Sequence, residues 1–122
     1  MILCVDDEPN GLRIREMLLR SQGYQVLTAT SGREGLELFA SNPISLVVLD
    51  YLMPEMDGGE VAAVMKQLKP EVKILLFSAY IDLPAAAGEW VDSLAVKGTA
   101  PEQFLQTIQQ LLSSAEVDAR SS

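Results

Sequence analysis

The chain has 122 residues, which is enough for one domain with a hydrophobic core and too few for two. Its 17 acidic and 9 basic side chains give a formal charge of −8, which disfavours direct binding to nucleic acid or to an anionic membrane. One cysteine and no histidine exclude a disulfide framework, and no apolar run approaches the ~20 residues that span a bilayer. We therefore expect a cytoplasmic protein without a secretory leader, whose chemistry uses carboxylates, hydroxyls and lysine.

The first third of the chain is predicted to alternate strand and helix. The apolar run over residues 2–6 predicts a strand, a helix over 10–22 follows it, and residues 25–29 predict a second strand. Ser31 begins the next helix and forms a capping box with Glu34, three residues later. The apolar sides of the two helices are expected to consist of Leu12, Met17, Leu19, Leu36, Phe39 and Ala40.

The rest of the chain continues this alternation. The expected elements are strands over 45–49, 72–77 and 91–96, a helix from Gly58 to about Leu68, and a short helix within 81–88. Thr99 and Glu102 predict a second capping box, and Pro101 suits the first turn of the last helix. The buried stripe of that helix is expected to contain Phe104, Leu105, Ile108, Leu111 and Leu112. We assign residues 1–115 to one domain and 116–122 to a polar, disordered tail.

Alternating strands and helices predict an α/β fold with a doubly wound parallel sheet and helices on both faces. In such sheets the binding crevice lies outside the carboxyl ends of the strands. Five residues with chemistry fall at predicted strand ends, namely Asp6, Asp7, Asp50, Ser78 and Lys97. This convergence predicts one polar site at one edge of the sheet.

The three carboxylates would repel one another strongly if all were ionised, and a hard divalent cation such as Mg²⁺ relieves that repulsion. Lys97 can neutralise the cluster and hold a phosphoryl oxygen as a point charge. A carboxylate can itself accept a phosphoryl group to form an aspartyl phosphate. Plainer alternatives stay open for single residues: Asp6 and Asp7 could form a strand-end turn with a helix cap, and Lys97 could be a surface amine.

Two small residues complete the expected site. Ser78 ends a predicted strand and can donate a hydrogen bond to the same phosphoryl oxygen, although it could also be a solvated strand terminus. Ala79 follows it and is small enough to leave the site open to a bulky phosphoryl donor.

With these residues in place, the chain resembles the receiver domain of two-component response regulators, the CheY-like superfamily. The resemblance covers nearly the whole chain. It rests on the Asp6-Asp7 pair, on the Asp-x-x-Met-Pro-x-Met-Asp-Gly segment that begins at Asp50, on Ser78-Ala79, and on Lys97. These motifs occur in the order and spacing of that family.

The resemblance implies a flavodoxin-like fold with strand order 2-1-3-4-5 and Asp50 as the phosphoacceptor. It implies that Asp7, Asp50 and the backbone carbonyl of Leu52 ligate Mg²⁺, with Asp6 acting mainly through water. Ser78 and Lys97 would contact the phosphoryl oxygens. Leu52 and Tyr80 match positions that tune hydrolysis, and because both are bulky we expect a fairly long-lived phosphoryl group.

The resemblance also implies partners. The donor would be the phosphohistidine of a sensor histidine kinase or phosphotransfer protein, and the output would be a downstream protein or an attached domain in a phosphorelay. The face made by the fourth helix, fifth strand and fifth helix normally carries output, and a homodimer could form through it. Self-phosphorylation and slow autodephosphorylation are expected, and the chain is not expected to be a metabolic enzyme.

The chain departs from the family pattern at two places. The family usually has a proline after the lysine, with a cis peptide between them, where this chain has Gly98. A cis bond before a non-proline residue costs roughly 2.5–4 kcal/mol, so we predict a trans Lys97–Gly98 peptide and a rearranged loop. The family also places an aromatic switch residue three positions before the lysine, where this chain has Leu94.

Three functions follow as hypotheses. The leading one is a receiver whose phosphorylation switches a protein-interaction surface. The second is a degenerate receiver that dimerises or docks without phosphate, which Gly98 and Leu94 keep open. The third is a small Mg²⁺-dependent phosphohydrolase, which the Leu52 position disfavours because a second acid is expected there.

Overall fold

The computed structural model describes residues 1–79 and 83–121, and its strands and helices alternate along the chain. The strands are β1 (Ile2–Val5), β2 (Val26–Ala29), β3 (Leu46–Asp50), β4 (Lys73–Ser78) and β5 (Ser93–Val96). The helices are α1 (Pro9–Ser21), α2 (Gly32–Ser41), α3 (Gly58–Leu68) and α4 (Pro101–Ser121), with a 3₁₀ turn, η1, over Ala85–Gly88. No helix of the described residues is long and apolar enough to cross a membrane.

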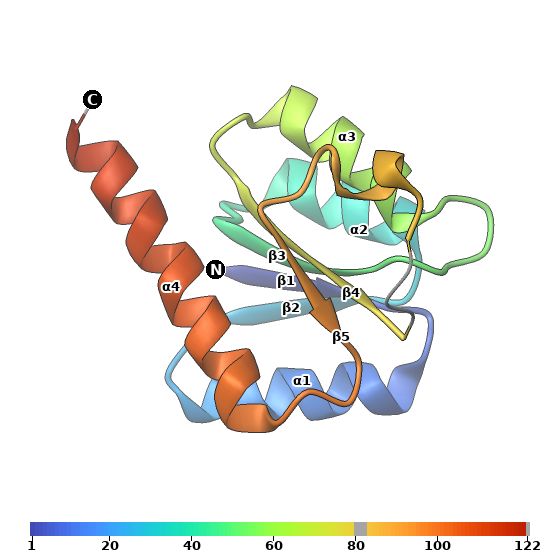
Figure 1. Ribbon diagram of the computed structural model, residues 1–122, viewed down its shortest axis with the longest axis horizontal. Helices are drawn as coiled ribbons and strands as arrows, with labels where there is room; N and C mark the ends of the chain where they lie inside the picture. The colour runs from blue at the N-terminus through green and yellow to red at the C-terminus, as the bar shows by residue number, and fades with distance from the viewer. Residues whose placement is uncertain (80–82, 122) are drawn as a thin grey trace.

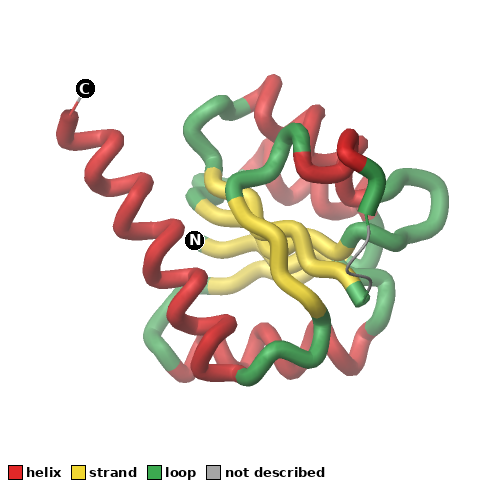
Figure 2. Tube along the Cα trace, in the orientation of Figure 1, coloured by secondary structure: helices red, strands yellow, loops and turns green. Residues whose placement is uncertain are grey.

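The five strands form one parallel sheet in the order β2-β1-β3-β4-β5, as the resemblance implied. Helices α2 and α3 cover one face, and α1 and the first half of α4 cover the other (Figure 1). Figure 2 shows the resulting three layers, with the yellow strands of the sheet between two layers of red helices. The fold is therefore the predicted flavodoxin-like, doubly wound α/β arrangement.

The sheet separates two hydrophobic clusters, and this explains why the central strands are apolar on both sides. Alternate residues of β3 enter opposite clusters: Val47 and Leu49 pack with α2 and α3, whereas Leu46 and Val48 pack with α1 and α4. Every residue of β1 and β3 is buried. Strand β5 alternates between half-buried and exposed residues, because it is the edge strand.

The sequence predicted two capping boxes at helix starts, and the structure contains one of them. The Ser31 hydroxyl accepts a hydrogen bond from the Glu34 amide at 3.1 Å, which confirms the first capping box. The second capping box is wrong. Helix α4 begins at Pro101, so Thr99 lies outside the cap position, and its hydroxyl donates to the Val96 carbonyl at 2.5 Å.

Three further expectations differ from the structure. Met17 and Ala40 lie on exposed sides of α1 and α2. Of the short helix predicted within 81–88, only the 3₁₀ turn η1 lies in the described residues, because residues 81 and 82 are outside them. Helical backbone in α4 continues to Ser121, beyond the predicted boundary at residue 115; the division into a domain and a tail stays a prediction.

Candidate functional site

Parallel pairing brings the polar residues together at one edge of the sheet. Asp50 is the last residue of β3 and Ser78 the last of β4, while Asp6 follows β1 and Lys97 follows β5. The register pairs Asp50 with Phe77, so Ser78 lies one residue further along the same edge. The Lys97 amide donates to the Ser78 carbonyl at 2.7 Å, which fixes the start of the loop after β5.

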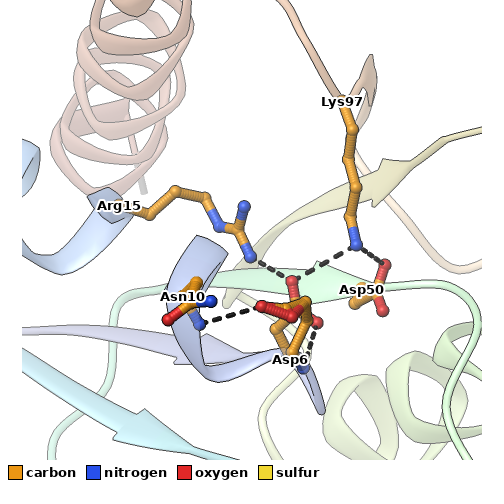
Figure 3. A network of polar contacts seen from close by, with 6 residues as sticks. Asp6, Asn10, Arg15, Asp50 and Lys97 are labelled. Carbon is orange, nitrogen blue, oxygen red and sulfur yellow. Dashed lines mark hydrogen bonds and ion pairs between the residues drawn. The ribbon is translucent and has the colours of Figure 1, made fainter. Parts of the chain in front are cut away.

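Asp6 is almost fully buried and is held by three donors (Figure 3). Its Oδ1 accepts from the Glu8 amide at 2.9 Å, and its Oδ2 contacts Arg15 Nη2 and, at 3.3 Å, Lys97 Nζ. Burial acts to raise the pKa of Asp6, but the Glu8 hydrogen bond and the two cations outweigh it and hold the pKa below its ordinary value. Asp6 is therefore an ionised group inside the sheet edge.

Asp50 is also buried, but it has one cationic partner. Lys97 Nζ lies 2.9 Å from its Oδ1. Burial raises the pKa of Asp50 to about 6, and the charge of Asp6 adds to the shift while Lys97 opposes it. For Lys97, burial opposes the charged form, but the hydrogen bond and charge of Asp50, together with the charge of Asp6, raise its pKa. Lys97 thus contacts two carboxylates whose pKa values are shifted in opposite directions, downward for Asp6 and upward for Asp50.

Asp7 completes a set of oxygen ligands. One carboxylate oxygen each from Asp6, Asp7 and Asp50 lies within 4.8 Å of the others, and Asp7 is exposed to solvent. Carboxylate oxygens around a partly open position fit a hard divalent cation such as Mg²⁺, which keeps several waters. Helix α1 is capped by Glu8, whose side chain accepts from the Asn10 amide at 3.0 Å. The alternative of a strand-end turn with a helix cap is therefore wrong about the cap, but the turn is present, since Asp6 Oδ1 accepts from the Glu8 amide two residues later.

The remaining predicted residues differ in how far they are exposed to solvent. Ser78 is buried, Ala79 is exposed, and the Leu52 side chain is 52% exposed. Leu94, which stands where the family has an aromatic switch residue, is 57% exposed on the edge strand β5. Tyr80 lies outside the described residues, so its effect on hydrolysis stays a prediction.

The loop after Lys97 differs from the family pattern as expected. The described residues contain no cis peptide, so the Lys97–Gly98 bond is trans. Gly98 has a φ of +95°, a left-handed conformation that glycine adopts freely and proline cannot. The trans peptide still allows Lys97 to reach both Asp6 and Asp50, so the glycine at this position does not remove the lysine from the site.

Arg15 belongs to the site, although the sequence did not single it out. It reaches Asp6 from α1, whereas Lys97 reaches the same carboxylate from β5 (Figure 3). A signal was available in the sequence. Arg15 follows Leu12 by three residues and precedes Leu19 by four, which places a charged residue on the buried side of α1.

Comparison with known proteins gives consistent findings. A family model described as the response regulator receiver domain matches residues 2–114. The chain is 33% identical over 114 residues to the transcriptional regulatory protein GlrR of Escherichia coli strain K12, which covers 91% of this chain and 26% of that protein. The chain spans between a quarter and a half of the length of the first curated relatives that it matches.

Solved structures agree with the fold. A response regulator receiver domain protein (CheY-like) from Methanospirillum hungatei JF-1 has a TM-score of 0.92 and 27% identity, with 96% of each chain covered. The response regulator protein TrrA from Thermotoga maritima, in complex with Mg²⁺-BeF, has a TM-score of 0.83 and 35% identity. That match covers 90% of this chain and 96% of TrrA.

Proposed function

Because the chain belongs to the response regulator receiver domain family, we propose that Asp50 accepts a phosphoryl group from a phosphohistidine. The donor is a sensor histidine kinase or a phosphotransfer protein. One observation carries the proposal: a buried carboxylate at the end of the central strand β3 is held 2.9 Å from Lys97 Nζ, beside two further carboxylates. A carboxylate with a purely structural role would not require a lysine and two further carboxylates around it.

The transfer requires little covalent chemistry from the protein. An Asp50 oxygen forms a bond to phosphorus as the phosphorus–nitrogen bond of the phosphohistidine breaks, and the imidazole nitrogen leaves with the electron pair. Lys97 offsets charge on the phosphoryl oxygens, and Ser78 donates to one of them. Positioning and charge compensation then supply the rate acceleration, as in phosphoryl transfer generally.

Asp7 and Asp50 would hold Mg²⁺ directly, with the Leu52 carbonyl as a third ligand and Asp6 acting through water. Bound Mg²⁺ would neutralise charge that develops on the phosphoryl oxygens. The donor set supports this assignment, because one carboxylate oxygen each from Asp6, Asp7 and Asp50 lies within 4.8 Å of the others, and Asp7 is exposed. The TrrA neighbour, at 35% identity, was solved in complex with Mg²⁺-BeF, which lends support by similarity.

The proposed role is a switch in the cytoplasm, with no turnover beyond self-phosphorylation and slow autodephosphorylation. Phosphorylation would bias the loop after β4 and the face made by η1, β5 and α4 toward a downstream protein or output domain. Because Leu94 replaces the usual aromatic residue, we expect backbone movement of the loop after Ser78 to transmit the change. Homodimerisation through this face is part of the proposal.

The test is the intact mass of the protein after incubation with MgCl₂ and acetyl phosphate. We expect one phosphate adduct on the wild type, since acetate leaves as the Asp50–phosphorus bond forms. Asp50→Asn should carry none, and Asp57→Asn is the matched control, because Asp57 caps α3 and lies outside the acidic cluster. Omitting MgCl₂, with EDTA present, should also remove the adduct.

The opposite results are equally informative. A wild type that stays unmodified, under conditions that label a known receiver, would contradict phosphoryl acceptance and favour the phosphate-independent docking module. An adduct that persists in Asp50→Asn would place the acceptor elsewhere.

A further inference from the structure

Arg15 is a second cation inside the acidic cluster, separate from Lys97. Its side chain is 11% exposed, and Nη2 contacts Oδ2 of an Asp6 carboxylate that is itself 1% exposed. Lys97 Nζ contacts the same oxygen at 3.3 Å. Asp6 Oδ1 is already occupied by the Glu8 amide, so both oxygens of this carboxylate have partners.

Two neighbours keep the guanidinium in this position. Its central carbon lies 5.0 Å from the centroid of the Phe77 ring, within the range of a cation–π interaction. On the other side, Gly11 leaves space in α1, because a Cβ built there would lie 3.3 Å from Arg15 Nη1. A glycine inside a helix is destabilising relative to alanine, so this space has a cost to the fold.

The contacts of Arg15 affect the net charge of the cluster at which a divalent cation would bind. Asp6, Asp7 and Asp50 carry three negative charges when ionised, and Lys97 and Arg15 carry two positive ones within the same cluster. Lys97 has a further use in the proposed transfer, since it faces the acceptor Asp50. Arg15 contacts only Asp6 among these three carboxylates, so its charge opposes a divalent cation without facing the acceptor.

We propose that Arg15 is a resident counter-ion that weakens Mg²⁺ binding and thereby sets the Mg²⁺ concentration at which the acidic cluster fills. The inference rests on the proposed function, since it concerns the same cation site. Arg15 acts through Asp6 and is a positioning residue. A unit charge in contact with one carboxylate of the cluster changes the binding constant of a divalent ion by about tenfold or more at the effective dielectric constants of such sites.

The experiment is an NMR titration with MgCl₂ alone, at constant ionic strength, on the 122-residue chain after EDTA treatment and removal of the EDTA. Arg15→Gln removes the charge but keeps a polar side chain with an amide donor at this position. We expect its dissociation constant for Mg²⁺ to fall about tenfold or more below that of the wild type. Arg13→Gln removes the same charge from an exposed position of α1, and its dissociation constant should match that of the wild type.

Arg15→Met is a second neutral variant, because its thioether can pack against the Phe77 ring. An unchanged or larger dissociation constant in whichever neutral variant folds would overturn the proposal. Loss of folding in both neutral variants, restored by Arg15→Lys, would make Arg15 a purely structural ion-pair partner and would also overturn it. A wild type that binds no Mg²⁺ would instead contradict the metal site of the proposed function, which is a different result.

Discussion

The central strands and the edge strand of the sheet supply different halves of the site. Strands β1 and β3 are buried along their whole length and carry the carboxylates at their ends. Lys97 directly follows strand β5, and two of the four residues of that strand, Leu94 and Val96, are exposed. Among the described residues just before β5, 83–92, the structure has the 3₁₀ turn η1.

This contrast separates two requirements on a switch. The proposed acceptor, Asp50, needs a fixed geometry, because phosphoryl transfer depends on positioning. In the proposed switch, Lys97 would have to move, and regions that move are drawn from the less stable parts of a fold. The central strands meet the first requirement, and β5 with its glycine loop is suited to the second.

The strongest test of the contrast compares two leucine truncations. Leu49 is fully buried in β3, so Leu49→Ala should lower the free energy of unfolding by about 2–5 kcal/mol. Leu94→Ala on β5 should cost less than about 1 kcal/mol, because more than half of that side chain is already exposed. Urea unfolding followed by circular dichroism measures both. Equal losses of unfolding free energy in the two variants would show that Leu94 contributes as much to stability as Leu49, and would contradict the contrast between β5 and β3.

A smaller effect on the free energy of unfolding is expected from Asp50→Asn, which neutralises the proposed acceptor, when Mg²⁺ is absent. Burial raises the pKa of Asp50 from 3.8 to about 6, so the folded state holds its proton more tightly than the unfolded state does. Stability from this group is therefore lost as pH rises from about 4 to about 6. At pH 7, Asp50→Asn should unfold with a free energy about 1–3 kcal/mol higher than that of the wild type, an order-of-magnitude figure.

The check on that prediction is a pH series of denaturant unfolding in EDTA. The advantage of Asp50→Asn should shrink as the pH falls through 6 and disappear below about pH 3, where the Asp50 carboxyl is neutral in both the folded and the unfolded state. Adding MgCl₂ should stabilise the wild type more than the variant, since the variant lacks one proposed ligand. An advantage that is constant from pH 4 to pH 7 would contradict the burial argument.

The smallest effect concerns the loop that follows Lys97. Gly98 has a φ of +95° and nothing within 4 Å of a built Cβ, so the cost of a side chain there comes from the backbone alone. Gly98→Ala should lower the melting temperature by an amount equivalent to about 1 kcal/mol. Gly98→Asn should cost less, because asparagine tolerates this conformation better. A larger loss in Gly98→Asn than in Gly98→Ala would point to a contact and not to backbone conformation.

Much of the fold was predictable because local signals agreed with the global pattern. Ser31 and Gly58 mark helix starts, and apolar runs that end in charge marked the strand ends, so the meeting of Asp6, Asp50 and Lys97 followed from parallel topology. Thr99 misled, because Pro101 sets the helix start and leaves the threonine outside it. Arg15 was missed, since pairing with a buried carboxylate is a tertiary event that helical periodicity alone does not identify.

The buried Cys4 thiol offers a way to measure how often the sheet opens to solvent. Cys4 lies on β1 with no exposed surface, and burial raises its pKa to about 12, so the thiol is unreactive while the sheet is closed. It is the one cysteine of the chain, so a thiol-directed reagent has a single target. The rate of covalent labelling therefore measures how often the central sheet opens far enough to expose Cys4. If that rate falls when Mg²⁺ binds the cluster of Asp6, Asp7 and Asp50, the fall measures how much binding stabilises the closed sheet.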